Sequence, residues 1–497
     1  MESFAHGTVD TNTDSWVFCY GDEKNGRRAC ASGHLTTADQ RWNSQACFVS
    51  IFTAFAENPL ILVIEYMRTK NILKNVLNIR RREMRFNIVT IGSRGDVQPF
   101  IALCKALKQR GHESKITTFM NFKDFIEEEG IEFSPLAGDA VEVIRLLVGE
   151  NVTTSEYFRN LSVLLNPVKN QFFHDLEESC IDVDAVLCST IGTVVYHVAE
   201  KMNLPLFRVA FCPLDPTKEF PAMTAPYLPG LHLYNRFTFW MGDRLWSHVT
   251  RKLCNDWRVD LGLEKIPFGK FPYRKMKGKV IPTLYAYSSI ISPKPKEYKE
   301  YHHLTGFWIN ELEEDYVCDK ELQDFLDRGE KPIYIGFGSI VGKDFEQLFH
   351  IVMESLRITG KRAILSSGWG KLEGVDVPDN VYQVKSVPHE WLFTKVAAVV
   401  HHGGAGTTAA GVRAGVPSVI VPFGGDQPFW GRQLHRMNIG TKPILRKNLT
   451  VKRLSKAIME VTTNQEMIAE AKKIGQKLRA ERGAQNAVSV IEKEICL

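Results

Sequence analysis

Residues 399–408 read Val-Val-His-His-Gly-Gly-Ala-Gly-Thr-Thr, and this stretch decides the fold. An apolar strand runs directly into glycines and then into a helix-forming segment, which leaves the first N–H groups of the helix without intrahelical partners. Such a helix start binds anions, because the free N–H groups and the positive end of the helix dipole favour negative charge. The hydroxyl of Thr407 and the imidazole of His402 add two hydrogen-bonding groups. The stretch therefore predicts a phosphate site.

The next apolar run, residues 416–423, delivers Asp426 and Gln427 just beyond its end. Open α/β sheets bind ligands at the carboxyl ends of their strands, so these two side chains are expected beside the phosphate site. A carboxylate next to an amide suits sugar hydroxyls, which both donate and accept hydrogen bonds. The pair predicts that a sugar is attached to the phosphate.

Of three other interpretations of this stretch, two stay open beside the sugar-phosphate site and one is excluded. Gly404, Gly406 and Ala409 fit a degenerate dinucleotide-binding fingerprint, with Asp426 at about the spacing of its ribose-binding acid. A P-loop is excluded, since no Gly-Lys-Ser or Gly-Lys-Thr follows the glycines to hold a triphosphate. The third interpretation is structural, with glycines that only allow close packing at a helix start.

A second glycine turn follows the apolar strand predicted for residues 86–91, and an amphipathic helix follows the turn through Gln109. The turn carries Ser93, Arg94 and Asp96. A carboxylate at this edge can take a proton from an alcohol, so Asp96 is the candidate general base. Ser93 and Arg94 are expected to contact a phosphate or to hold the turn. The alternative for Asp96 is a helix-capping acid with a structural arginine beside it.

Four segments in this order resemble sterol 3-beta-glucosyltransferases, and the resemblance extends from about residue 85 to about residue 440. The segments are Gly-Ser-Arg-Gly-Asp-Val-Gln-Pro-Phe-Ile-Ala-Leu-Cys-Lys at 92–105, Tyr-Ile-Gly-Phe-Gly-Ser at 334–339, Val-Pro-His-Glu-Trp-Leu-Phe at 387–393 and His-His-Gly-Gly-Ala-Gly-Thr-Thr at 401–408. Residues 1–84 have no counterpart in that resemblance.

The fold class that the resemblance implies is α/β of the GT-B type, with two Rossmann-like domains facing each other across a cleft. Residues 85–300 would form the acceptor-binding domain, and residues 301–497 the domain that binds UDP-sugar and ends in C-terminal helices. The charged residues 469–495 are expected to cross back to the first domain. Residues 1–84 are expected to be a poorly ordered or atypical tail, because they combine polar stretches with a basic run.

The same resemblance implies a role for each matched residue. Asp96 would deprotonate the acceptor hydroxyl, and Ser93 and Arg94 would lie beside the donor. The diphosphate would be held by His402, Ala405, Gly406 and Thr407, the glucose hydroxyls by Asp426 and Gln427, and the nucleoside side by Ser339, Val387 and His389. Uracil would pack near Trp391. Transfer from α-linked UDP-glucose would then invert the anomeric centre and give a β-glucoside, with no metal and no further cofactor.

Composition agrees with a globular enzyme and excludes several other classes. The chain has 497 residues, 44% of them hydrophobic, which is enough for two full cores. A net charge of +5 is too small to argue for nucleic acid, and it would aid contact with an anionic membrane. Ten cysteines without a Cys-x-x-Cys pair indicate neither a zinc site nor a disulfide framework. With no secretion signal or membrane span in the sequence, we expect a cytoplasmic protein that associates peripherally with membranes.

The acceptor is the part of the site that the sequence defines least. Residues 211–280 are rich in aromatic side chains, and we expect the acceptor pocket there. Helical spacing of Tyr234, Phe237, Met241 and Leu245 equally favours a stripe that faces the core. Residues 268–279 interleave cations with aromatics, as a loop touching anionic lipid headgroups would, although a solvated loop fits as well. A sterol is the expected acceptor; the alternatives are another apolar aglycone or an inactive lipid-binding relative.

Overall fold

The computed structural model describes the backbone of residues 5–10, 15–22 and 27–34, and then residues 83–142, 160, 167–223, 225–310, 316–338, 344–366, 377–385 and 387–495. The chain divides into two compact units, residues 1–81 and residues 82–497. In the first unit, an antiparallel sheet consists of β1 (Ala5–Asp10), β2 (Ser15–Asp22) and β3 (Arg27–His34) in that order. This sheet lies within the segment expected to be an atypical tail.

The second unit begins with a seven-stranded parallel sheet in the order β12-β11-β8-β7-β4-β5-β6. Its strands are β4 (Arg85–Val89), β5 (Glu113–Phe119), β6 (Glu132–Leu136), β7 (Ala185–Cys188), β8 (Leu206–Ala210), β11 (Thr283–Tyr285) and β12 (His302–Leu304). The central strands β7 and β8 are buried along their whole length, as strands covered by helices on both faces must be.

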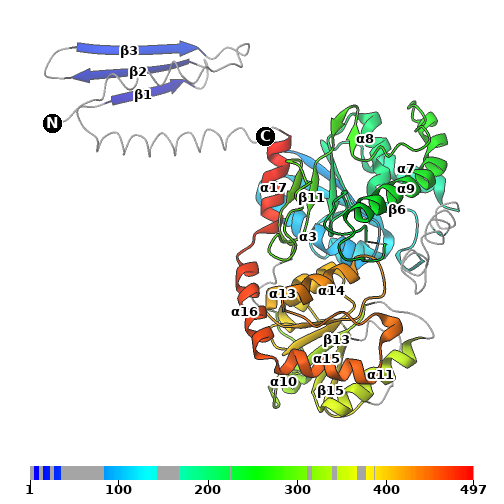
Figure 1. The fold of residues 1–497 in the computed structure, drawn as a ribbon. Coiled ribbons are helices and arrows are strands. Elements are labelled where there is room, and N and C mark those ends of the chain that lie inside the picture. Colours follow the sequence, from blue (N-terminus) through cyan, green and yellow to red (C-terminus); the bar gives the residue numbers. More distant parts are fainter. Residues whose placement is uncertain are drawn as a thin grey trace. The chain divides into compact units, whose positions relative to one another are not determined.

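Helices and turns connect these strands (Figure 1). They are α3 (Arg94–Gln109), η1 (Met120–Phe122), α4 (Lys123–Glu127), α7 (Lys169–Ser179), η2 (Ile191–Val195), α8 (Tyr196–Met202) and the long α9 (His232–Asp260). A short hairpin of β9 (Lys275–Met276) and β10 (Lys279–Val280) follows α9. The predicted strand, glycine turn and helix through Gln109 are confirmed.

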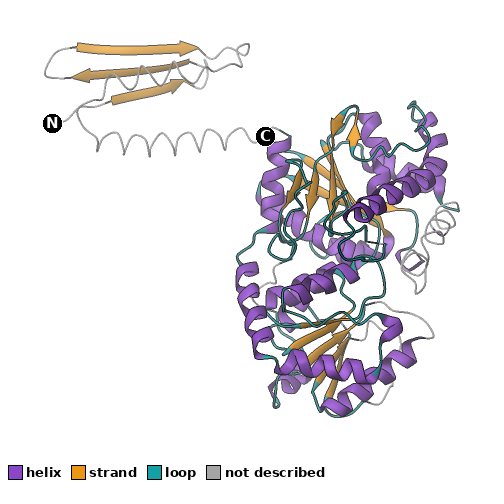
Figure 2. Cartoon of the chain, in the orientation of Figure 1, coloured by secondary structure: helices purple, strands orange, loops and turns teal. Residues whose placement is uncertain are grey.

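A second parallel sheet has the order β15-β14-β13-β16-β17, and Figure 2 shows helices on both of its sides. Its strands are β13 (Ile333–Gly336), β14 (Ala363–Ser366), β15 (Val381–Val384), β16 (Ala398–His401) and β17 (Ser418–Ile420). The helical elements are α10 (Lys320–Asp327), α11 (Asp344–Thr359), α12 (His389–Leu392), α13 (Ala405–Ala414), α14 (Gln427–Arg436), η4 (Arg446–Asn448), α15 (Val451–Thr463) and α16 (Gln465–Arg479). Two parallel α/β sheets are thus present, as the sequence predicted.

The last helix, α17 (Gly483–Glu494), returns to the first sheet and packs along α3. Ala487, Val488 and Ile491 are fully buried in the same core cluster as residues of α3. At the edge of this contact, the Arg110 guanidinium donates to the Glu492 carboxylate at 3.1 Å. The expected return of the C-terminal helices is therefore made by α17. We predicted that the domain boundary lies between residues 300 and 301. The strand β12 follows this boundary in the chain but still belongs to the first sheet.

The two sheets' domains also share an apolar cluster. Phe220 lies edge-on to Phe429 with ring centroids 5.1 Å apart, and Tyr287 lies edge-on to Trp430 at 5.8 Å. Phe220 and Tyr287 belong to the first domain, whereas Phe429 and Trp430 lie on α14. This contact fixes the start of α14 against the segment that follows β8.

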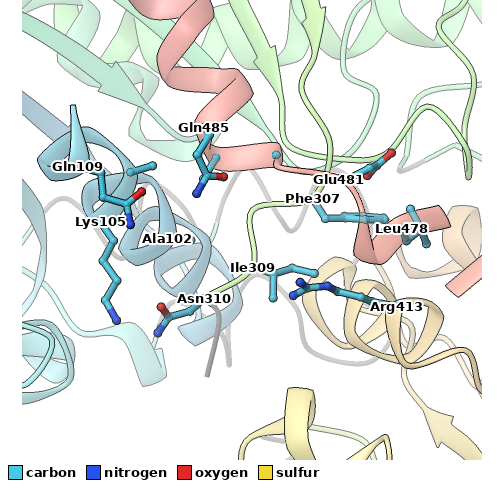
Figure 3. A pocket seen from close by; sticks show the side chains of 13 residues that line it. Ala102, Lys105, Gln109, Phe307, Ile309, Asn310, Arg413, Leu478, Glu481 and Gln485 are labelled. Carbon is cyan, nitrogen blue, oxygen red and sulfur yellow. The ribbon is translucent and has the colours of Figure 1, made fainter. Parts of the chain in front are cut away.

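A cavity of about 170 Å³ lies where α3, α13 and the C-terminal helices meet. Figure 3 shows Lys105 and Gln109 on one side of it, with Arg413 and Glu481 on the other. Lys105 and Gln109 lie in the C-terminal half of α3 and Arg413 in that of α13, whereas Glu481 lies between α16 and α17. The cavity is therefore at the opposite ends of these two helices from Asp96 and Gly406.

Candidate active site

The predicted anion site is the turn between β16 and α13. Gly404 is the N-cap of α13 and provides no side-chain cap, and the Thr408 N–H is bonded to the Gly404 carbonyl at 2.9 Å. In a helix, the N–H groups before this first bond point away from the helix and lack backbone partners. These are the N–H groups of Ala405, Gly406 and Thr407, three of the residues predicted to hold the diphosphate.

Each glycine of this turn occupies its position for a different physical reason. Gly403 has a φ of +93°, and a Cβ there would lie 2.6 Å from Cγ2 of Ile420. A Cβ on Gly404 would lie 2.5 Å from Nε2 of His402, so this position keeps the imidazole close to the helix start. A Cβ on Gly406 would meet no atom of the described residues within 4 Å. As far as the described residues go, the space in front of Gly406 is open, as a bound phosphate would require.

His402 lies within this turn as a neutral ring. Burial lowers the pKa of His402 to about 4, so the side chain is uncharged at neutral pH. Its Nδ1 atom is buried and finds no hydrogen-bond partner among the described residues. A buried nitrogen of this kind costs free energy until a ligand bonds to it. A hydrogen bond with the Gly336 backbone opposes the effect of burial on the pKa of His402. The Nδ1 atom could accept a bond from or donate one to a ligand, and the predicted contact with the diphosphate stays a prediction.

Asp426 and Gln427 stand at the start of α14, and both are held by local hydrogen bonds. The Asp426 Oδ2 atom accepts from the indole of Trp430 at 2.8 Å. The Gln427 Oε1 atom accepts from the backbone N–H groups of Phe423 at 2.7 Å and Gly424 at 3.2 Å. These bonds occupy the carbonyl oxygen of Gln427 and leave its NH₂ group for a ligand. Burial, with the nearby Asp96 as a smaller cause, raises the pKa of Asp426 to about 6.

Asp96 is the third residue of α3 and forms a capping box with Ser93. Its Oδ2 atom accepts from the Ser93 backbone at 2.7 Å and from the Ser93 hydroxyl at 2.9 Å. Burial raises the pKa of Asp96, and the two bonds from Ser93 oppose this effect. Asp96 thus caps the helix from its third position, whereas the N-cap itself is Ser93 and the bonding partner is Ser93 and not an arginine. This capping role does not compete with the role of base, since a raised pKa is what a proton acceptor near neutral pH needs.

Asp96 and Asp426 come from different domains and act on each other. Asp96 contributes to the raised pKa of Asp426, and both carboxylates contribute to the raised pKa of Cys212, after burial as the largest cause. Cys212 follows β8 at the carboxyl edge of the first sheet. The sequence analysis missed this residue, although its place directly after a buried strand was a usable signal.

The residues predicted to bind the nucleoside are only partly among the described residues. Ser339 lies outside the described residues, and Val387 is half-buried. His389 stacks on Phe393 with centroids 4.6 Å apart, and its Nε2 atom lies 3.1 Å from the Tyr334 hydroxyl. Burial lowers the pKa of His389 to about 4, with His402 and Arg94 as further causes. His389, His402 and Arg94 are therefore near one another.

Arg94 is exposed, and its guanidinium lies 4.3 Å from the centroid of the Phe125 ring. Burial raises the pKa of Glu390, and the charge of Arg94 partly opposes this rise. Since Glu390 and His389 belong to the second domain, Arg94 reaches from α3 toward the predicted donor side. Its expected place beside the donor stays a prediction.

The aromatic residues of 211–280 divide into two groups that the sequence did not separate. Phe220, Phe239, Trp257 and Tyr273 are buried in core clusters. Phe237 and Met241, by contrast, are exposed, so the predicted core-facing stripe on α9 is wrong for them. Among the described residues, no group of three or more His, Cys, Asp or Glu side chains has the arrangement of a metal site. Nor does any helix in the described ranges have the length and apolar character to cross a bilayer.

Two family models match the chain, one in each domain. Residues 86–221 match the glycosyltransferase family 28 N-terminal domain, and residues 364–493 match the erythromycin biosynthesis protein CIII-like C-terminal domain. Both Asp96 and the turn at Gly406 lie inside these matches.

Similar proteins include fungal enzymes named sterol 3-beta-glucosyltransferase. The one from Aspergillus terreus is 34% identical over 436 residues, which cover 85% of this chain and 31% of that protein. The one from Neosartorya fischeri is 35% identical, covering 85% of this chain and 30% of that protein. The chain thus spans about a third of the length of these relatives.

Solved structures with the same fold include three glycosyltransferases. The kitacinnamycin glycosyltransferase has a TM-score of 0.62 at 17% identity, covering 83% of this chain and 99% of that chain. The calicheamicin glycosyltransferase CalG4 has a TM-score of 0.62 at 16% identity, covering 83% and 98%. VinC in complex with DTDP has a TM-score of 0.56 at 18% identity, covering 82% and 99%. The predicted GT-B architecture is confirmed by this likeness.

Proposed function

We propose that this protein transfers glucose from UDP-glucose to the 3-beta-hydroxyl of a membrane sterol. The chain matches a family 28 glycosyltransferase N-terminal domain and an EryCIII-like C-terminal domain, and both lie in one GT-B fold. One observation carries the proposal. Two half-buried carboxylates, Asp96 and Asp426, come from different domains and lie close enough for Asp96 to raise the pKa of Asp426. The sterol acceptor is supported by relatives of that name at 34–35% identity.

In the proposed reaction, Asp96 takes the proton of the sterol hydroxyl. The hydroxyl oxygen then forms a bond to the anomeric carbon while the bond from that carbon to the UDP oxygen breaks. Attack from the face opposite to the leaving group inverts the configuration, so an α-linked donor gives a β-glucoside. General-base catalysis of this kind contributes about 10²–10⁴-fold to the rate.

The leaving diphosphate would be stabilised by α13. The N–H groups of Ala405, Gly406 and Thr407 and the positive end of the helix dipole oppose the charge that develops on UDP. The Nδ1 atom of His402, which has no partner among the described residues, supports a further contact at this site. Because the pKa of His402 is about 4, the ring binds as a hydrogen-bonding group and not as a permanent cation.

The glucose would be oriented by Asp426 and Gln427. With a pKa of about 6, Asp426 is ionised at neutral pH and accepts hydrogen bonds from sugar hydroxyls. Gln427 donates through its free NH₂ group. We assign the nucleoside side to Ser339, Val387 and His389, with uracil near Trp391, whose ring lies edge-on to Tyr316 at 5.3 Å.

A second acceptor class has its own support. The C-terminal family model is named for erythromycin biosynthesis, and the structural neighbours include the glycosyltransferases named for kitacinnamycin and calicheamicin. The competing proposal is therefore transfer to another apolar aglycone by the same machinery.

The test compares donors and acceptors on the purified chain. Calorimetry with UDP, UDP-glucose, UDP-galactose and dTDP-glucose measures donor choice, and UDP release with and without detergent-dispersed cholesterol or ergosterol measures acceptor use. We expect UDP-glucose to bind and UDP release to depend on sterol. Release that requires a macrolide aglycone instead would favour the second proposal, and failure to bind any nucleotide sugar would contradict both.

A further inference from the structure

The first half of α9 turns an apolar face toward solvent. Leu233, Phe237 and Trp240 follow one another at steps of four and three residues, so they lie on one side of the helix. Their exposed fractions are 81%, 51% and 47%. Asn235 and Phe239, on the other side of the same turns, are buried. An amphipathic helix of a globular domain normally buries its apolar side, so this exposed side requires an explanation.

Phe268, which follows α9 in the chain, extends the apolar surface on this side of the helix. It is 74% exposed and lies beside α9, with its ring 6.4 Å from that of His248 and 5.4 Å from the guanidinium of Arg251. Positions 244, 248 and 251 follow positions 233, 237 and 240 along one side of α9 at helical spacing. We call the surface formed by Leu233, Phe237, Trp240, Met241 and Phe268 the α9 ridge.

Positive charge borders the α9 ridge. Arg236 and Arg244 are exposed between its apolar side chains, and the Arg244 guanidinium lies 4.8 Å from the Trp240 ring centroid. The acid in this part of α9, Asp243, bonds to Arg274 at 2.5 and 3.0 Å, so its charge is already compensated. Residues 268–279 contain five basic residues and no acidic one. Four of these cations are exposed: Lys270, Lys275, Lys277 and Lys279.

We propose that the α9 ridge docks on the headgroup region of an anionic lipid bilayer. Tryptophan, phenylalanine and leucine on one face with arginine and lysine around them are the side chains that lie at the boundary of headgroups and acyl chains. The basic border is complementary to anionic lipids, which attract cations close to such a surface. An apolar protein partner would not need these exposed arginines and lysines beside the contact. The proposal goes beyond the proposed reaction and does not depend on the sugar that is transferred.

The buried side of α9 connects the ridge to the candidate active site. Thr238 accepts from the Ala222 backbone at 2.9 Å, and Asn235 donates to the Lys218 carbonyl at 2.8 Å. Phe239 shares an apolar cluster with Phe220 and Trp430. The Trp430 indole in turn bonds to Asp426. A bilayer held at the ridge would therefore lie against the helix that supports the sugar side of the site.

The test is co-sedimentation of the full chain with phosphatidylcholine vesicles, with and without phosphatidylserine, in the absence of sterol and donor. We expect binding that requires phosphatidylserine and weakens with salt. A variant with Leu233→Ser, Phe237→Ser and Trp240→Ser should lose about tenfold or more of its vesicle affinity. The matched control carries Ile358→Ser and Met459→Ser, which are exposed apolar residues of α11 and α15, and should bind like the unmodified chain.

A second variant isolates the charge. Lys270→Gln, Lys275→Gln and Lys277→Gln together should reduce binding to phosphatidylserine vesicles while leaving the thermal unfolding midpoint unchanged. The docking proposal is overturned if the unmodified chain does not sediment with anionic vesicles, or if the ridge and control variants bind equally. It is also overturned if sedimentation velocity shows a dimer that only the ridge variant loses, because the ridge would then bind a second copy. None of these outcomes depends on glucosyl transfer, so they leave the proposed reaction to its own test.

Discussion

At the start of α3, one carboxylate meets two requirements. Asp96 caps the helix through two hydrogen bonds from Ser93, and it lies at the carboxyl edge of the first sheet, where an acceptor hydroxyl would approach. A sequence pattern alone could not separate these roles, because a capping acid and a catalytic acid occupy the same position after a glycine turn. The three-dimensional arrangement adds what the pattern lacks: Asp426, from the other domain, is close enough to be affected by Asp96.

Asp96→Asn separates the two roles. Asparagine retains an oxygen that accepts from the Ser93 backbone but does not take a proton, so kcat should fall by about 10²–10⁴-fold while UDP affinity stays within about twofold. Steady-state kinetics and calorimetry measure the two quantities. In the unmodified enzyme, kcat/KM should fall on the acidic side as the pH drops through the raised pKa of Asp96.

Ser93→Ala is the comparison for Asp96→Asn. It removes one hydrogen bond of the cap, at a cost of about 1 kcal/mol, and keeps the carboxylate. Its turnover should therefore fall far less than that of Asp96→Asn. Equal losses in the two variants would show that the cap, and not the base, accounts for the effect.

Asp426 should weaken the folded state at neutral pH. Its pKa is raised to about 6, whereas the same group in an unfolded chain has the ordinary value of 3.8. The protonated form is thus favoured by folding, and this stability is present below pH 4 and lost as the pH rises through 6. A shift of about two units corresponds to about 3 kcal/mol.

Asp426→Asn should then raise the thermal unfolding midpoint at pH 7.5, and the gain should shrink as the pH falls toward 4. Asparagine keeps an oxygen for the Trp430 indole, so the local hydrogen bond is retained. Thermal scans of both proteins from pH 4 to pH 8 measure the difference. A gain of the same size at every pH would contradict the assigned shift in pKa.

At the scale of the element, the anion-binding role that we propose for α13 depends on its first turn. The strand β16, the glycines and the helix were predicted from local pattern, because a buried apolar run and a glycine cluster need no distant residues to be recognised. The environment of α9 was not predictable in this way. Its helical spacing was visible, but only the packing of residues 217–222 against the opposite face determines that Phe237 and Met241 point to solvent.

Gly406→Ala tests the anion site. Gly406 is exposed in the first turn of α13, so an alanine there should not destabilise the helix. Alanine favours a helix over glycine by about 1 kcal/mol. Its methyl group would enter the open space where we expect the phosphate, so UDP affinity should fall by about tenfold. Gly411→Ala is the matched control on the same helix, since its Cβ would make only ordinary contacts of 3.5 Å and 3.9 Å. Similar UDP affinity in both variants would place the phosphate elsewhere.

Ile491→Ala tests the docking of α17 on α3. Ile491 is fully buried, and removing its outer carbons should cost about 2–4 kcal/mol and lower the unfolding midpoint. Lys493→Ala, at an exposed position of the same helix, should leave the midpoint unchanged. Differential scanning calorimetry makes the comparison. An unchanged midpoint for Ile491→Ala would mean that α17 does not contribute to the stability of the first domain.

At the scale of the whole molecule, the sequence predicted two parallel α/β sheets and the edges at which their ligand groups stand. Contacts between distant segments were harder to predict. The approach of Cys212 to Asp96 and Asp426 depends on how two domains face each other, and no local pattern records that arrangement. The contact of Phe220 with Phe429 has the same origin, since it joins a loop after β8 to a helix some two hundred residues later in the chain.

The measurement that tests the proposed function most directly is the structure of the product. Purified protein would be incubated with UDP-glucose and cholesterol or ergosterol, and the extracted lipid analysed by mass spectrometry and NMR. We predict a steryl glucoside with a β-configured anomeric proton, formed by the unmodified chain and not by Asp96→Asn. An α-linked product would contradict direct displacement by a hydroxyl that Asp96 activates, and UDP release without any glucosylated sterol would contradict the sterol acceptor.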